Sequence, residues 1–202
     1  MKQKSLTMAL IVVGICTLGV ISASAQAPIA SLFSVNYFAN NGVSGAPDAT
    51  VRVTNPGTAY ENICAMVYVF DNDQQMSECC GCLETPDGLR TFSVTKDLTS
   101  NPLTGVVSKN GDIKLLAWPV NDSPCNPAIV RDGGEMAPTG TNYLDAWATH
   151  IQNKVGTAYP ITETAFSDAG LSLGEFANLA ADCFFIQRLG SGHGICSCGT
   201  GD

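Results

Sequence analysis

The chain has 202 residues, of which 18 are acidic and 10 are basic, so its formal net charge at pH 7 is −8. Because it has no cluster of basic residues, Coulomb repulsion disfavours binding to nucleic acid or to an anionic membrane surface. Charged residues make up only 14% of the chain, alongside 20 glycines and 10 prolines, and this composition favours an all-β exported protein over a helical one.

Residues 1–25 predict a signal peptide. Two lysines stand in the first four residues, residues 6–21 are uncharged and mostly apolar, and residues 23–25 (Ala-Ser-Ala) match the small-residue pattern before a cleavage site. The apolar stretch is shorter than the roughly 20 residues that a membrane-spanning helix needs. We therefore expect cleavage after Ala25 rather than a membrane anchor.

Cleavage after Ala25 would leave residues 26–202 as a single domain without a transmembrane span. Cys16 is removed with the signal peptide, so the nine cysteines become eight. An even number of cysteines in an exported chain indicates disulfide bonds. We expect a protein that is secreted or located in the periplasm or at the cell surface, with disulfides formed by Cys64, Cys79, Cys80, Cys82, Cys125, Cys183, Cys196 and Cys198.

The first half of the mature chain predicts a series of short strands. Apolar or alternating segments place strands at residues 31–38, 49–55 and 63–70, and a weaker one at 89–95. The segment 63–70 is an unbroken apolar run, so we expect it to be buried on both faces of a sheet. Asn110-Gly111 favours a tight turn and predicts a hairpin between residues 106–109 and 112–118.

The second half predicts a loop, another hairpin and one helix. Prolines and glycines mark residues 119–140 as a long connection, and segments 143–152 and 159–166 are interpreted as a hairpin. A helix is expected at about residues 172–189, because Ser172 and Glu175 form a capping box ahead of one apolar stripe. The expected stripe consists of Leu173, Phe176, Ala177, Ala180, Cys183 and Phe184. Together these elements predict a mainly β protein, an immunoglobulin-like β-sandwich with one C-terminal amphipathic helix stapled to it by disulfides.

Residues 79–82 (Cys-Cys-Gly-Cys) are the densest feature of the sequence. Cysteines this close can bond to each other only through a strained ring, so at least two of the three must pair with distant cysteines. We expect Cys183 to pair with a tail cysteine, and the other tail cysteine, Cys64 and Cys125 to take the remaining bonds. About four disulfides would each stabilise the fold by about 2–4 kcal/mol.

A metal or redox site is the main alternative for these cysteines. The segment Cys79–Cys82, the Cys-x-Cys tail and His193 could together supply soft ligands for zinc or copper. Cys79 and Cys82 alone could form a redox pair. Export argues against the metal site, because free thiolates oxidise outside the cytoplasm. The redox pair lacks a thioredoxin-like strand-to-helix context, and Cys80 inside it would interfere.

Two further chemistries have weaker support. Asp71 and Asp73, with Glu78 nearby, could bind calcium in a loop, although the EF-hand spacing fails. A secreted hydrolase would have to use His150 or His193, and the glycine frame around Ser191 does not match a nucleophile elbow. We assign no catalytic, cofactor-binding or metal-ligating residue, and we consider an enzyme less favoured than a binding protein.

Four segments resemble sequences of uncharacterised secreted bacterial proteins. They are MVYVFDNDQQMSECCGC (66–82), TPDGLRTFSV (85–94), DLTSNPLTG (97–105) and LGSGHGICSC (189–198). The resemblance implies export and a shared disulfide framework around a CCxC element, and it carries no activity or substrate with it. We expect an exported, non-catalytic structural or binding module, adhesion-like, whose ligand is an unknown extracellular or cell-envelope component.

Overall fold

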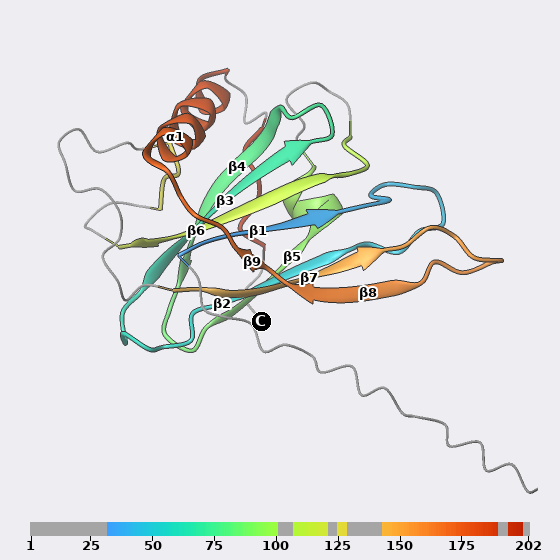
Figure 1. Ribbon diagram of the computed structural model, residues 1–202, viewed down its shortest axis with the longest axis horizontal. Helices are drawn as coiled ribbons and strands as arrows, with labels where there is room; N and C mark the ends of the chain where they lie inside the picture. Colours follow the sequence, from blue (N-terminus) through green and yellow to red (C-terminus); the bar gives the residue numbers. More distant parts are fainter. Residues whose placement is uncertain (1–31, 101–106, 121–124, 129–142, 190–193, 200–202) are drawn as a thin grey trace, which may run out of the picture.

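The computed structural model describes residues 32–100, 107–120, 125–128, 143–189 and 194–199. The expected signal peptide, most of the expected loop 119–140 and His193 lie outside these residues. Within the described part, the protein is mainly β, with two antiparallel sheets and one C-terminal helix (Figure 1). No helix in this part is long and apolar enough to cross a membrane.

One sheet has five strands and the other has four. The five-stranded sheet has the order β4-β3-β6-β1-β9, and the four-stranded sheet has the order β5-β2-β7-β8. The strands are β1 (Phe33–Phe38), β2 (Thr50–Thr54), β3 (Ile63–Asp71), β4 (Met76–Glu84), β5 (Leu89–Ser93), β6 (Gly111–Pro119), β7 (Asp145–Ile151), β8 (Ile161–Ala165) and β9 (Ser167–Asp168). A single π-helical turn, η1 (Val94–Leu98), follows β5, and the C-terminal helix is α1 (Leu173–Arg188).

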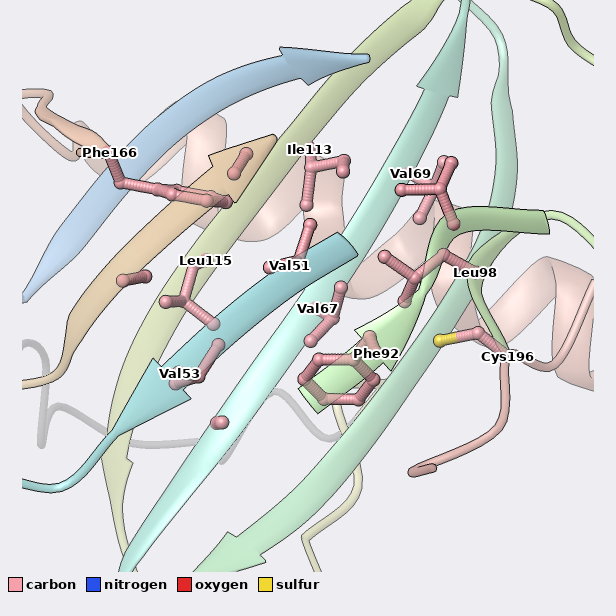
Figure 2. Packing of buried hydrophobic residues seen from close by; sticks show 14 of the residues in the cluster. Val51, Val53, Val67, Val69, Phe92, Leu98, Ile113, Leu115, Phe166 and Cys196 are labelled. Atoms are coloured by element: carbon pink, nitrogen blue, oxygen red, sulfur yellow. The ribbon is translucent and has the colours of Figure 1, made fainter. Parts of the chain in front are cut away.

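The five-stranded sheet is buried on both faces, so the fold has three layers. Along β3, Ile63, Ala65, Val67 and Val69 belong to the core between the two sheets, part of which is shown in Figure 2. The residues between them, from Cys64 to Tyr68, belong to a second core beneath α1. The expected double burial of segment 63–70 is confirmed, because an unbroken apolar run satisfies both faces at once.

The Cys-Cys-Gly-Cys segment lies in a strand that the sequence did not predict. β4 pairs antiparallel with β3, and Cys80 lies opposite Val67. Cysteine, serine, glutamate and glycine fill much of β4, and this mixture lacks the β-branched and aromatic residues that mark strands. The segment is nonetheless largely buried, because Cys79 faces the core beneath α1 and Cys80 and Cys82 face the core between the two sheets.

The hairpin expected around Asn110-Gly111 is wrong. Residues 107–110 form no strand, and β6 pairs instead with β1 and β3. The glycine has a different purpose: a Cβ at Gly111 would overlap the carbonyl oxygen of Phe70 and come within 2.8 Å of the Phe38 ring. Close approach of two neighbouring strands therefore explains this glycine, and a tight turn does not.

The C-terminal expectations are largely confirmed. β7 and β8 form the expected hairpin, and Ser172 caps α1, its hydroxyl accepting from the Glu175 amide at 3.1 Å. The expected apolar stripe is partly wrong, because Leu173 and Phe184 are exposed and α1 buries Leu179, Ala180, Cys183 and Ile186. The disulfide at Cys183 sets which side of the helix faces the sheet.

We predict that Gly81→Ala destabilises the protein by about 1–3 kcal/mol through overpacking. The new Cβ would overlap the carbonyl of Cys125 and lie 2.9 Å from the sulfur of Met66. Urea unfolding of the mature protein measures the change. Gly170→Ala is the matched control, because its Cβ would meet nothing within 4 Å, and an equal loss in both variants would contradict the prediction.

Candidate functional site

Four disulfides tie the helix, the tail and one loop to neighbouring strands β3 and β4. They join Cys64 to Cys125, Cys79 to Cys183, Cys80 to Cys196 and Cys82 to Cys198. All eight cysteines of the expected mature chain are bonded, and none of the three in residues 79–82 bonds to another of the three. The expected pairing is wrong in two respects: Cys183 bonds to this cluster rather than to the tail, and Cys64 and Cys125 bond to each other.

The alternation of side chains along β4 accounts for this pairing. Successive residues of a strand point to opposite faces of the sheet. Cys79 therefore faces α1, which supplies its partner, while Cys80 and Cys82 face the core between the sheets. Residues 79–82 therefore bond to α1 from one face of β4 and to the tail from the other.

The tail lies along the outer edge of β4 like an added strand. Cys79 and Ile195 form a parallel bridge, in which the Cys79 amide donates to Gly194 at 2.9 Å and the Cys196 amide donates to Cys79 at 3.3 Å. The bridge and both tail disulfides join residues 116 positions apart. This constant offset means that the tail and β4 run in register, and Figure 2 shows Cys196 inside the core near Leu98 and Phe92.

Arg90 holds the end of the tail by charge-assisted hydrogen bonds. Its Nε lies 2.5 Å from the carboxylate of Glu84, one terminal nitrogen donates to the Cys198 carbonyl at 2.9 Å, and the other donates to the Leu83 carbonyl at 3.0 Å. Burial raises the pKa of Glu84, and the Arg90 guanidinium opposes this shift. The tail is therefore held by a hydrogen bond from Arg90, which its partly buried ion pair with Glu84 positions, as well as by disulfides.

The structure brings three of the candidate metal-ligating sulfurs together. The Sγ atoms of Cys80, Cys82 and Cys198 all lie within 4.8 Å of one another. Each belongs to a disulfide, whereas the thiolate is the form that binds metal. Cys79 and Cys82 point to opposite faces and bond to different segments, so they do not form the redox pair considered above.

His150, the histidine that lies within the described residues, is fully buried on β7. Its Nε2 lies 2.7 Å from the hydroxyl of Thr164, and its ring stacks on Tyr37 with centroids 4.0 Å apart. Among the described residues, Nδ1 has no carboxylate partner. Burial lowers the pKa of His150, and the backbone of Tyr37 opposes the shift. The arrangement lacks the third group that orients a catalytic histidine.

The residues considered for calcium do not form one group. Asp71 shapes a turn, because its Oδ1 accepts from the amides of Asp73 at 2.9 Å and Gln75 at 3.0 Å. The hollow beside this turn is also lined by Lys109, whose charge opposes a cation. Glu78 is fully buried within β4. This geometry is that of a capped turn.

An apolar pocket of about 210 Å³ opens where α1 meets the five-stranded sheet. The start of β1, the end of β6, the connection from β9 and the first turns of α1 line it: Leu32, Phe33, Trp118, Asp168, Ala169, Gly170, Leu171, Ser172, Leu173 and Phe176. The rings of Trp118 and Phe176 stack with centroids 5.2 Å apart. The sequence identified both residues only as apolar members of a strand and a helix, so this pocket was not expected.

Comparison with known proteins found no match that bears on these observations. The sequence matches no protein-family model and no curated protein, and the fold matches no solved structure. The candidate site is the apolar pocket at the helix–sheet junction, one wall of which is α1, the helix that the Cys79–Cys183 disulfide ties to β4.

We predict that the disulfides contribute unequally. Replacing Cys79 and Cys183 by alanine should lower the free energy of unfolding by about 3 kcal/mol, and replacing Cys82 and Cys198 should lower it by about 2 kcal/mol. The reason is the size of the loop that each bond closes in the unfolded chain when Cys80–Cys196 is intact. The loop that runs through that link is about 15 residues long for Cys79–Cys183 and about 5 residues long for Cys82–Cys198.

Urea unfolding of both double variants tests this order. Titration of the denatured, unreduced wild type should find no free thiols. A larger loss from the Cys82–Cys198 variant would contradict the loop argument. Three or more free thiols with stoichiometric metal would support the metal site instead.

We predict that His150 makes stability fall as the pH falls below about 6.5. The unfolded histidine takes up a proton near that pH, whereas the pKa of the buried ring is lower. Between the two values the unfolded state binds more protons, so acid favours unfolding. Urea unfolding at pH 7.5 and 5.5 measures the loss, which should be smaller in His150→Gln, and equal losses would contradict the assignment.

Proposed function

We propose that the mature chain is an exported, non-catalytic binding module for an extracellular or cell-envelope ligand. The observation that carries the proposal is the preformed apolar pocket at the surface, in a fold whose helix and tail are both cross-linked to the central sheet. Apolar pockets with few polar groups are the usual form of small-molecule binding sites. Covalent fixing of the surrounding elements keeps the conformational cost of binding low.

The disulfides support the exported location. Disulfide bonds persist in oxidising compartments and are rare in the cytoplasm. Membership of a secreted family and an immunoglobulin-like strand topology are further parts of this proposal. Two facing antiparallel sheets are compatible with that topology.

A hydrolytic function is less well supported. Among the described residues, the fully buried His150 is paired with a threonine hydroxyl and lacks a carboxylate neighbour. Such a pair has a hydroxyl and a ring nitrogen, but it lacks the orienting group and the open approach that a nucleophile and base require.

We predict saturable binding of the mature chain to isolated bacterial cell envelopes or to their polysaccharide fraction, without breakdown of the bound material. Sedimentation measures binding, and chromatography of the supernatant measures released products. His150→Gln serves as the matched control and should bind as the wild type does. Release of products that stops in His150→Gln would overturn the proposal in favour of a hydrolase, and so would the absence of any binding.

A further inference from the structure

Contacts within the chain form the walls of the pocket at the helix–sheet junction. The rings of Trp118 and Phe176 stack at an interplanar angle of 8°. The Ala169 amide donates to the Phe33 carbonyl at 2.9 Å and fixes the connection from β9. In Figure 1 this connection rises from β9 to α1 across the face of the sheet. Because the walls are already positioned, a ligand would enter at little conformational cost.

The lining of the pocket is mostly aromatic and aliphatic. Trp118 and Phe176 supply aromatic rings, and Leu32, Leu171 and Leu173 supply aliphatic side chains. Leu173 stands at the rim with 60% of its surface exposed, so a ligand that covers it removes apolar surface from water. Contacts between aromatic rings are worth more than the area they bury. The lining therefore favours a molecule with an aromatic ring.

The polar groups in and around the pocket already have partners within the protein. Glu175, in the first turn of α1, is paired with Lys114 of β6 at 2.6 Å. The Ser172 hydroxyl accepts from the Glu175 amide and caps the helix, and Asp168 is also engaged within the protein. Among the described residues, no lysine or arginine lines the pocket. A charged ligand would therefore lose its hydration without gaining a partner, and an uncharged one is favoured.

The size of the pocket fits one ring with a short substituent. Its volume of about 210 Å³ exceeds the roughly 150 Å³ of an apolar cavity that binds benzene. Gly170 lines the pocket, and a Cβ built there would meet no atom within 4 Å. The space beside the connection from β9 is therefore open.

We propose that this pocket binds a small uncharged molecule made of an aromatic ring and a short apolar substituent. The ring lies against Trp118 and Phe176, and Leu173 covers its outer edge. The inference rests on the proposed binding function and names the site and the ligand class for it.

Three compounds of nearly one shape test the ligand class in the full mature protein: ethylbenzene, benzyl alcohol and benzylamine, which end in a methyl, a hydroxyl and an ammonium group. Titrations followed by the indole N–H signals in ¹H–¹⁵N spectra should move the signal of Trp118 and leave that of Trp147, on the other sheet, unchanged. We expect ethylbenzene to bind about tenfold more tightly than benzyl alcohol, because burial of an unpaired hydroxyl is costly. Benzylamine should bind most weakly.

Two variants assign the site. Gly170→Leu places a side chain in the open space and should weaken ethylbenzene by about tenfold or more, roughly the effect of filling the pocket with a leucine. Gly174→Leu is its matched control, because Gly174 does not line the pocket and its Cβ would have only the Ser172 hydroxyl within 4.0 Å.

Leu173→Ala should weaken ethylbenzene by about threefold, because it removes apolar contact at the rim. Leu189→Ala is its matched control, since Leu189 is also exposed and lies at the opposite end of α1. Neither control should change the affinity.

The outcomes separate this inference from the proposed function. Tighter binding of benzylamine than of ethylbenzene, or the same affinity for ethylbenzene in Gly170→Leu and Gly174→Leu, would overturn the assignment. Failure of ethylbenzene to bind, while isolated envelopes do bind, would overturn this inference and leave the binding module standing. Binding of ethylbenzene in the pocket without any binding to envelopes would overturn the envelope-directed function and leave the ligand class standing.

Discussion

The strict alternation of side chains along β4 is the constraint on which the rest of the structure depends. A strand presents neighbouring residues to opposite faces, and β4 uses this to bond Cys79 to the helix layer and Cys80 and Cys82 to the tail. Because β4 ends the five-stranded sheet, it is also where an unpaired edge would otherwise be exposed. The tail covers part of that edge, which protects the sheet from pairing with other chains.

The position of the pocket follows from the same constraint. The bond at Cys183 fixes which side of α1 faces the sheet, and that choice leaves Leu173 and Phe184 exposed while Phe176 lies against Trp118. The ion pair of Lys114 with Glu175 holds the other end of the helix. A helix fixed at two points cannot slide to close the space between its first turn and the sheet, so the space remains open.

Sequence patterns predicted the features that local chemistry determines. The double burial of segment 63–70 and the cap at Ser172 are such features, because an apolar run or a hydroxyl acts over a few residues. Gly111 was misinterpreted because a turn and a close strand contact both select glycine. β4 was missed because its burial comes from bonds to distant cysteines rather than from strand-forming residues.

The disulfide pairing and the pocket are non-local, and that is why they could not be derived. Eight cysteines allow 105 pairings, and sequence spacing does not say which face of a sheet each one meets. The pocket draws its walls from Leu32, Trp118 and the segment 168–176, which only the folded chain brings together. In both cases the missing information was which residues share a layer.

The spacing of the bonded cysteines affects when the disulfides can form during synthesis. Cys64 can meet Cys125 after 61 more residues, but the partners of Cys79, Cys80 and Cys82 follow only 104 to 116 residues later. A polypeptide that emerges N-terminus first therefore carries three closely spaced thiols without partners until residues 183–198 have been made. Correct oxidation then has to wait for that segment or proceed by thiol exchange, which takes seconds to hours, so a chain truncated before Cys183 would lack every covalent link from β4.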